Sequence, residues 1–218
     1  MSKTPIYFMP GLAANAAIFE RIALDCDSFE IIYLEWMIPH KKESLTDYAK
    51  RMSENIIHEN PVLIGVSFGG ILVQEMTRYI EARKVIIISS VKSNLEFPQR
   101  FRMAKATKIY KLIPTGMLIN IEKFAKFSFG KTINQRIKLY DKFLSVRNTD
   151  YLDWAIEQVI LWDRTEADQN VIHIHGDSDK IFPVQNIQNS ILISGGTHIM
   201  ILNKFKWLNA NLPRIILE

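Results

Sequence analysis

The chain has 218 residues, of which 48% are hydrophobic and 23% charged, so it can bury a substantial core and is too apolar to be disordered. No apolar run approaches the roughly 18 residues that cross a bilayer, and the first residues lack the apolar core of a signal peptide, so we expect a cytoplasmic protein with no transmembrane segment. The single cysteine, Cys26, excludes an internal disulfide, and its neighbours Asp25 and Asp27 disfavour the thiolate that a nucleophile needs.

Short β-rich runs alternate with helical patterns along the first 91 residues. We expect strands over residues 5–9, 29–34, 62–66 and 84–89. We expect helices over residues 15–24, 45–57 and 69–80, with Ser44 as the N-cap of the second. The strand runs are apolar without alternation, which is typical of strands covered by helices on both faces.

The pattern changes at residue 92. Residues 92–165 contain no convincing strand and predict a helical insertion that interrupts a core made of residues 1–91 and 166–218. This insertion carries 14 Lys and Arg against 7 Asp and Glu, which leaves 13 against 16 in the core. Its charge could attract an anionic substrate, or it could belong to solvated helix faces. No zinc-ligand pattern or aromatic stacking motif accompanies it, so we expect neither a metal nor a nucleic-acid partner.

Strands return after the insertion. We expect them over residues 170–175 and 190–194, with a helix after Pro183 and a closing helix over residues 199–211. The alternation predicts an α/β protein with a mainly parallel sheet of about six strands and helices on both faces.

A G-x-S-x-G segment, Gly65-Val66-Ser67-Phe68-Gly69, lies between an expected strand and an expected helix, as in a nucleophile elbow. Gly65 and Gly69 would leave room for a sharp turn that holds Ser67 in a strained conformation. The glycines could instead be packing devices or part of a phosphate-binding loop. A P-loop is disfavoured because no Gly-Lys-Ser/Thr sequence follows.

A serine nucleophile needs a base and an acid that orients the base. Of the five histidines, only His198 follows the last expected strand, although it could also be a capping or surface residue. Asp177 and Asp179 follow the preceding strand, and either could supply the acid. The order serine, aspartate, histidine is the one found in α/β-hydrolases.

With these three segments in place, the sequence resembles the α/β-hydrolase superfamily over nearly the whole chain except the insertion. The resemblance favours Asp179 as the acid, with Asp177 shaping the turn, and so implies a catalytic triad of Ser67, Asp179 and His198. It also implies that residues 92–165 form a cap over the site.

The segment Phe8-Met9-Pro10-Gly11-Leu12 resembles the oxyanion loop of this superfamily, although Pro10 stands where the family often has histidine. The resemblance implies an oxyanion hole made by the backbone N–H groups of Leu12 and Phe68. The expected sheet has no counterpart of the first two strands of the full fold.

The implied reaction is acyl transfer to water from a carboxylic ester or thioester, with no cofactor and no metal. The same triad serves acyltransferases and some lyases, and a slow or inactive ligand-binding protein can share the fold. Large apolar residues of the insertion either line an acyl pocket or form the insertion's own core: Phe97, Phe101, Met103, Ile109, Tyr110, Met117, Leu118, Phe124, Phe127, Phe129 and Trp154.

Overall fold

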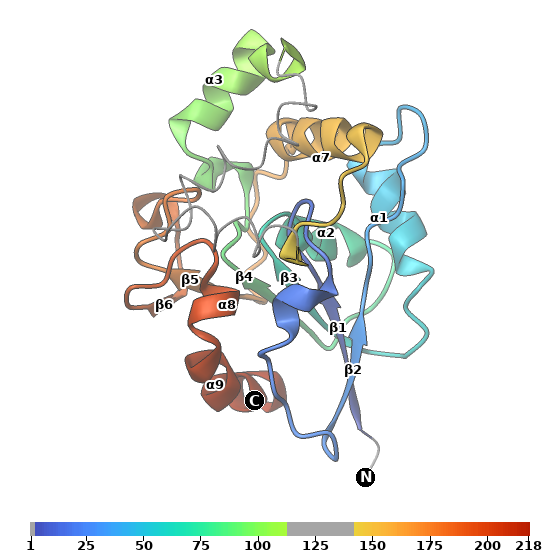
Figure 1. The fold of residues 1–218 in the computed structure, drawn as a ribbon, viewed down its shortest axis with the longest axis vertical. Coiled ribbons are helices and arrows are strands. Elements are labelled where there is room, and N and C mark those ends of the chain that lie inside the picture. The colour runs from blue at the N-terminus through green and yellow to red at the C-terminus, as the bar shows by residue number, and fades with distance from the viewer. Residues whose placement is uncertain (1–2, 113–141) are drawn as a thin grey trace.

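The computed structural model describes residues 3–112 and 142–218, which include a six-stranded sheet that is parallel throughout (Figure 1). Its strand order is β2-β1-β3-β4-β5-β6. The strands are β1 (Thr4–Met9), β2 (Phe29–Tyr33), β3 (Val62–Val66), β4 (Lys84–Ile88), β5 (Val171–Gly176) and β6 (Ile191–Ile193). Each lies within one residue of the expected range at both ends, so the predicted α/β fold class is confirmed.

Both faces of the sheet are covered from β1 to β5, because alternate residues of these strands enter different apolar clusters. Tyr7 and Met9 of β1 pack with α1 (Leu45–Ser53) and α2 (Phe68–Met76). Ile6 and Phe8 pack on the opposite face with residues of α8 (Met200–Asn203) and α9 (Phe205–Leu217). A strand with two buried faces needs apolar side chains at every position, which explains the unbroken apolar runs.

Two of the expected helices are only short 3₁₀ helices in the structure. Residues 15–24 contain only the 3₁₀ helix η1 (Ala16–Phe19), whose four residues already bury Ile18 and Phe19. The helix expected after Pro183 is one short 3₁₀ turn, η4 (Val184–Asn186). The chain leaves this turn extended, and the backbone N–H of Gln188 then reaches the carboxylate of Glu96.

The closing helix is divided at Lys204 into α8 and α9, and α9 continues to Leu217, beyond the expected end at residue 211. Lys204 has φ −111° and ψ 19°, which is not α-helical and allows α9 to begin in a new direction. The helices α1 and α2 each end four residues before the expected boundary.

The described part of residues 92–165 contains helices and no strand. It contains η2 (Asn94–Glu96), α3 (Gln99–Thr107), η3 (Ile109–Leu112) and α7 (Thr149–Leu161). Figure 1 places α3 and α7 at the end of the molecule toward which β1 runs. Five candidate pocket residues lie outside the described residues: Met117, Leu118, Phe124, Phe127 and Phe129. No helix within the described ranges is long and apolar enough to cross a membrane.

Candidate active site

Three polar side chains from separate loops meet beyond the carboxyl ends of the strands. Ser67 directly follows β3, Asp179 follows β5, and His198 follows β6. His198 Nε2 lies 2.9 Å from Ser67 Oγ, and His198 Nδ1 lies 2.9 Å from Asp179 Oδ2. The structure therefore brings the three sequence-predicted residues into one hydrogen-bonded chain. The His198 side chain remains 19% exposed, so a small molecule can approach it.

The turn between β3 and α2 holds Ser67 in a conformation that side chains other than glycine rarely adopt. Ser67 has φ 53° and ψ −119°, and such a backbone conformation costs on the order of 1–3 kcal/mol unless its surroundings enforce it. Its N–H donates to the Ile88 carbonyl at 3.0 Å, and its own carbonyl accepts from Ser90 Oγ at 2.7 Å. These two bonds to the end of β4 fix the serine in place.

Both glycines of the G-x-S-x-G segment lie where a side chain has no room. A Cβ on Gly65 would collide with the carbonyl group of Gly69, and a Cβ on Gly69 would collide with the carbonyl oxygens of Met9 and Pro10. The glycines therefore let α2 start close to both β3 and β1. They bring the serine next to the loop after β1.

Asp179 is a buried carboxylate with a full set of partners. It is 4% exposed, and its Oδ1 accepts from the N–H groups of Ile181 at 2.7 Å and Phe182 at 3.0 Å. Burial by itself would raise the pKa of Asp179, but the charge and hydrogen bond of His198, with the Phe182 N–H, hold this pKa below its ordinary value. The group is therefore ionised at neutral pH and can orient His198.

Asp177 has different contacts. Its Oδ1 accepts from the Gly195 N–H at 2.8 Å and from Ser178 Oγ at 2.9 Å, so it ties the loop after β5 to the loop after β6. The carboxylate that contacts His198 is that of Asp179.

Two buried histidines beneath the acid were missed by the sequence reasoning. His175 Nε2 donates to the Phe182 carbonyl at 2.9 Å, and His173 Nε2 lies 3.1 Å from His175 Nδ1. Burial lowers the pKa of both groups, so both rings are neutral, and the carbonyl acceptor places the His175 proton on Nε2. The pair braces the turn that positions Asp179. Its sequence signal was the spacing of two residues, which puts both rings on one face of β5.

The loop after β1 lies against Ser67. A Cβ added to Gly11 would be 3.4 Å from Ser67 Cβ. The Ala14 N–H closes a turn on the Gly11 carbonyl at 3.0 Å, and Ala13 has φ 61°. Within residues 3–112 and 142–218, the N–H groups of Leu12 and Phe68 donate no hydrogen bond.

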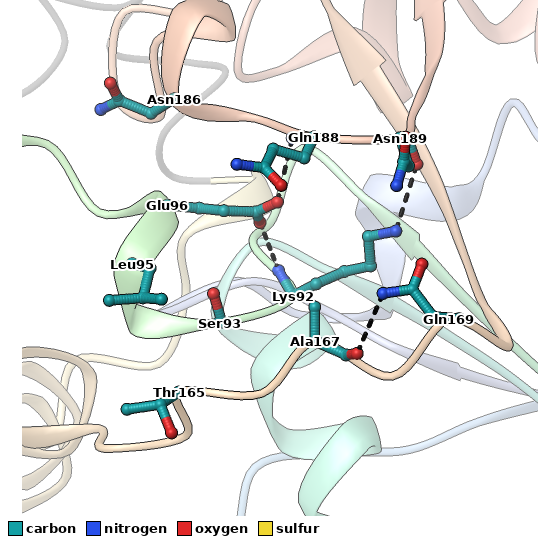
Figure 2. Close-up of a pocket in the computed structure, with 10 residues that line it drawn as sticks. All are labelled: Lys92, Ser93, Leu95, Glu96, Thr165, Ala167, Gln169, Asn186, Gln188 and Asn189. Atoms are coloured by element: carbon teal, nitrogen blue, oxygen red, sulfur yellow. Dashed lines mark hydrogen bonds between the residues drawn. The ribbon is translucent and has the colours of Figure 1, made fainter.

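A separate polar cavity of about 210 Å³ lies between the loops after β4, α7 and η4 (Figure 2). Lys92 Nζ donates there to the Asn189 carbonyl at 3.2 Å, and the Glu96 carboxylate accepts from the Lys92 N–H at 2.6 Å. Burial raises the pKa of Glu96. None of Ser67, Asp179 and His198 lines this cavity, so it is distinct from the space around the serine.

Solved structures resemble this chain over its full length. An esterase from Exiguobacterium antarcticum matches with a TM-score of 0.70 and 18% identity, covering 100% of this chain and 93% of the other. A thermophilic esterase from Thermogutta terrifontis gives 0.69 and 13%, with 99% and 90% covered. A hydrolase from Oleispira antarctica gives 0.72 and 12%, with 99% and 92% covered.

The chain has the α/β-hydrolase fold. No family model matches its sequence, and no curated protein matches it. At these identities the likeness concerns the fold, and an α/β-hydrolase fold carries many chemistries, so the activity has to be argued from the residues of the site. No group of three or more His, Cys, Asp or Glu side chains in the described part of the chain could hold a metal ion.

Proposed function

We propose that this protein is a serine hydrolase that cleaves a carboxylic ester or thioester through an acyl-enzyme on Ser67. The hydrogen-bonded chain from Ser67 through His198 to Asp179 carries the proposal, because each link has the geometry that nucleophilic catalysis needs. If His198 had only a structural role, the strained backbone conformation that points Ser67 toward it would not be needed.

In the first half of the reaction, Ser67 Oγ attacks the carbonyl carbon while His198 Nε2 takes the hydroxyl proton. Asp179 stabilises the imidazolium that forms and keeps a proton on His198 Nδ1. The negative oxygen of the tetrahedral intermediate accepts from the N–H groups of Leu12 and Phe68. Phe68 is the first residue of α2, and the helix dipole favours negative charge at this N-terminus. The alcohol or thiol then leaves with the proton from His198 Nε2.

In the second half, a water molecule attacks the acyl group on Ser67. His198 Nε2 takes the water proton, the same two N–H groups bind the new oxyanion, and the C–O bond to Ser67 breaks as the serine regains its proton. The acid product is released, and the protein returns to its starting state. Each oxyanion donor contributes on the order of 3 kcal/mol of barrier lowering in enzymes of this type.

Residues 92–165 serve in this proposal as a cap over the serine. From α7, Tyr151 and Trp154 pack near Phe68, the residue after the nucleophile; the rings of Phe68 and Trp154 lie 6.0 Å apart. Phe97, Tyr110 and Trp154 are buried, which favours packing roles for them, whereas Met103 and Ile109 are exposed. The apolar side chains around Phe68 suit an apolar acyl chain better than a charged acyl chain.

The test is hydrolysis of p-nitrophenyl acyl esters of increasing chain length, with an acyl-thioester series beside it. Ser67→Ala is expected to lose all turnover above the uncatalysed rate, whereas Ser28→Ala, which changes an exposed serine of the turn before β2, should match the wild type. A fluorophosphonate probe should label the wild type and Ser28→Ala but not Ser67→Ala.

Two results would contradict the proposal. If Ser67→Ala still turns over the substrate, Ser67 is not the nucleophile. A wild-type protein that is stabilised by an acyl ligand, yet neither turns over nor reacts with the probe, would be a binding protein on this fold.

A further inference from the structure

We infer that Trp36 is a positioning residue that holds the oxyanion hole in its active orientation; this inference rests on the proposed function. Trp36 lies in the segment after β2, and its indole Nε1 donates to the Gly11 carbonyl at 2.9 Å. The nucleophile and the oxyanion loop follow other strands. In the strand order β2 lies beside β1 on the side away from β3, so the indole comes from the strand next to the loop after β1.

The Gly11 carbonyl and the Leu12 N–H belong to the same peptide unit. In a planar trans peptide the C=O and N–H bonds point in opposite directions, so an acceptor fixed on one side fixes the donor on the other. The Gly11 oxygen accepts from Trp36 Nε1 and also from the Ala14 N–H at 3.0 Å. Rotating this peptide to turn the Leu12 N–H away would break both bonds.

The next two peptides of the loop are held as well. The Ala13 N–H donates to the hydroxyl of Tyr151 from α7 at 3.4 Å, and the Ala13 carbonyl accepts from the Val146 N–H at 3.2 Å. Ala13 itself has φ 61°, which an alanine adopts only when neighbours enforce it. The turn is thus a strained segment that depends on outside partners, and among the described residues Trp36 binds the Gly11 peptide by a side chain.

The same indole contacts the side chain of Phe68, the residue whose N–H is the second oxyanion donor. Its ring stacks on Phe68, with the ring centres 5.0 Å apart and the planes 8° from parallel. The ring of Tyr151 also packs against Trp36, with the two ring centres 5.3 Å apart. One half-buried side chain therefore links the residues whose N–H groups would bind the oxyanion.

This arrangement affects the transition state more than the bound substrate. The oxyanion exists only after attack, so a Leu12 N–H that is free to rotate weakens the intermediate and leaves ground-state contacts unchanged. Loss of the Trp36 bond should therefore lower kcat with little change in KM.

The experiment compares Trp36→Phe with the wild type on the best p-nitrophenyl ester. Phenylalanine keeps an aromatic ring for Phe68 but has no N–H for Gly11. We expect kcat to fall about tenfold with KM within about twofold, less than the 10²–10³ that follows removal of an oxyanion donor, because Ala14 still holds the carbonyl. Active-site titration with an activated ester counts the folded, competent protein, so that misfolding does not pass for slow chemistry.

Trp162→Phe is the matched control. Its indole Nε1 also donates within the same apolar cluster, but to Glu75 Oε1 at 3.0 Å and away from the loop after β1. This variant should lose stability, and its kcat per titrated site should fall less than that of Trp36→Phe. Tyr151→Phe removes the hydroxyl that binds the Ala13 N–H and should lower kcat in the same direction as Trp36→Phe, by a smaller factor.

The affinity for an alkyl boronic acid, whose adduct with the serine is tetrahedral, should fall with kcat in Trp36→Phe. The role of Trp36 is refuted if Trp36→Phe keeps its kcat, or if only KM rises, while Ser67→Ala is inactive. If Ser67→Ala is as active as the wild type, the proposed function itself is wrong and the role of Trp36 in it is wrong too.

Discussion

Replacing Asp179 by asparagine tests the proposed triad sharply. The substitution preserves the shape of the side chain but changes which nitrogen of His198 carries the ring proton. The asparagine Oδ1 can still accept from the Ile181 and Phe182 N–H groups, which lie 2.7 and 3.0 Å from the present oxygen. Its amide nitrogen would then face His198 Nδ1, now 2.9 Å from Asp179 Oδ2. An amide nitrogen only donates, so His198 Nδ1 would have to accept and the ring proton would move to Nε2.

A ring protonated on Nε2 cannot take the proton of Ser67. In serine proteases this change of tautomer costs about 10⁴ in kcat, which corresponds to about 5.5 kcal/mol of activation free energy at 1.36 kcal/mol per tenfold. We expect a loss of this size for Asp179→Asn, measured as kcat per titrated site on the best ester.

Asp177→Asn is the control. Its oxygen can continue to accept from the Gly195 N–H, so the loops stay tied and kcat should fall by less than about tenfold. Equal losses in the two variants, or a loss under tenfold in Asp179→Asn, would refute the assignment of the acid.

Stability gives an independent reading of the same carboxylate. The folded pKa of Asp179 is below its unfolded value near 4, so its ionised form adds stability above that pH, and this contribution is lost as the pH falls through the folded pKa. The gap in Tm between the wild type and Asp179→Asn should therefore shrink below about pH 4. A gap that grows on acidification would contradict the direction of the shift.

Two further predictions concern the framework of the site. Gly65→Ala should cost more than about 3 kcal/mol in urea unfolding, because its Cβ would meet the backbone of Gly69, whereas Gly195→Ala at φ 62° should cost about 1 kcal/mol; equal costs would contradict the steric argument. Burial keeps the pKa of His173 below its unfolded value near 6.5, so the unfolded chain binds more protons and stability falls as the pH drops below about 6.5. Thermal unfolding between pH 8 and 5 should show this fall, flatter in His173→Gln, and an unchanged slope in that variant would refute it.

The sheet could be predicted closely because each buried strand has a local signature. Runs such as residues 62–66 and 85–88 are apolar at every position, and a strand covered on both faces needs that pattern. The meeting of Ser67, Asp179 and His198 was foreseeable for a related reason, since parallel strands present their carboxyl ends at one edge.

Features that depend on tertiary partners could not be predicted in this way. Residues 15–24 have helical spacing, yet only four of them form a 3₁₀ helix, and the chain buries Ile22 beyond the end of that helix without further helical turns. The bond from Trp36 to Gly11 joins residues that are 25 positions apart, and nothing in the local sequence marks a tryptophan as the donor. The pairing of His173 with His175 depends on the Phe182 carbonyl, which accepts from the second ring and lies seven positions beyond it in the chain.

The placement of His198 poses a problem of distance that the loops after β5 and β6 solve. Ser67 follows β3 and His198 follows the edge strand β6, three strand spacings or about 14 Å away at the sheet. The loop after β6 must therefore pass back over the end of β5. It does so by close contact between Gly176 and Gly196, where a Cβ on either residue would collide with the other, and by a hydrogen bond from the Ser178 N–H to the Gly196 carbonyl at 2.9 Å. Gly176 and Gly196 are thus required by the crossing itself, and the histidine reaches the serine because the two loops touch backbone to backbone.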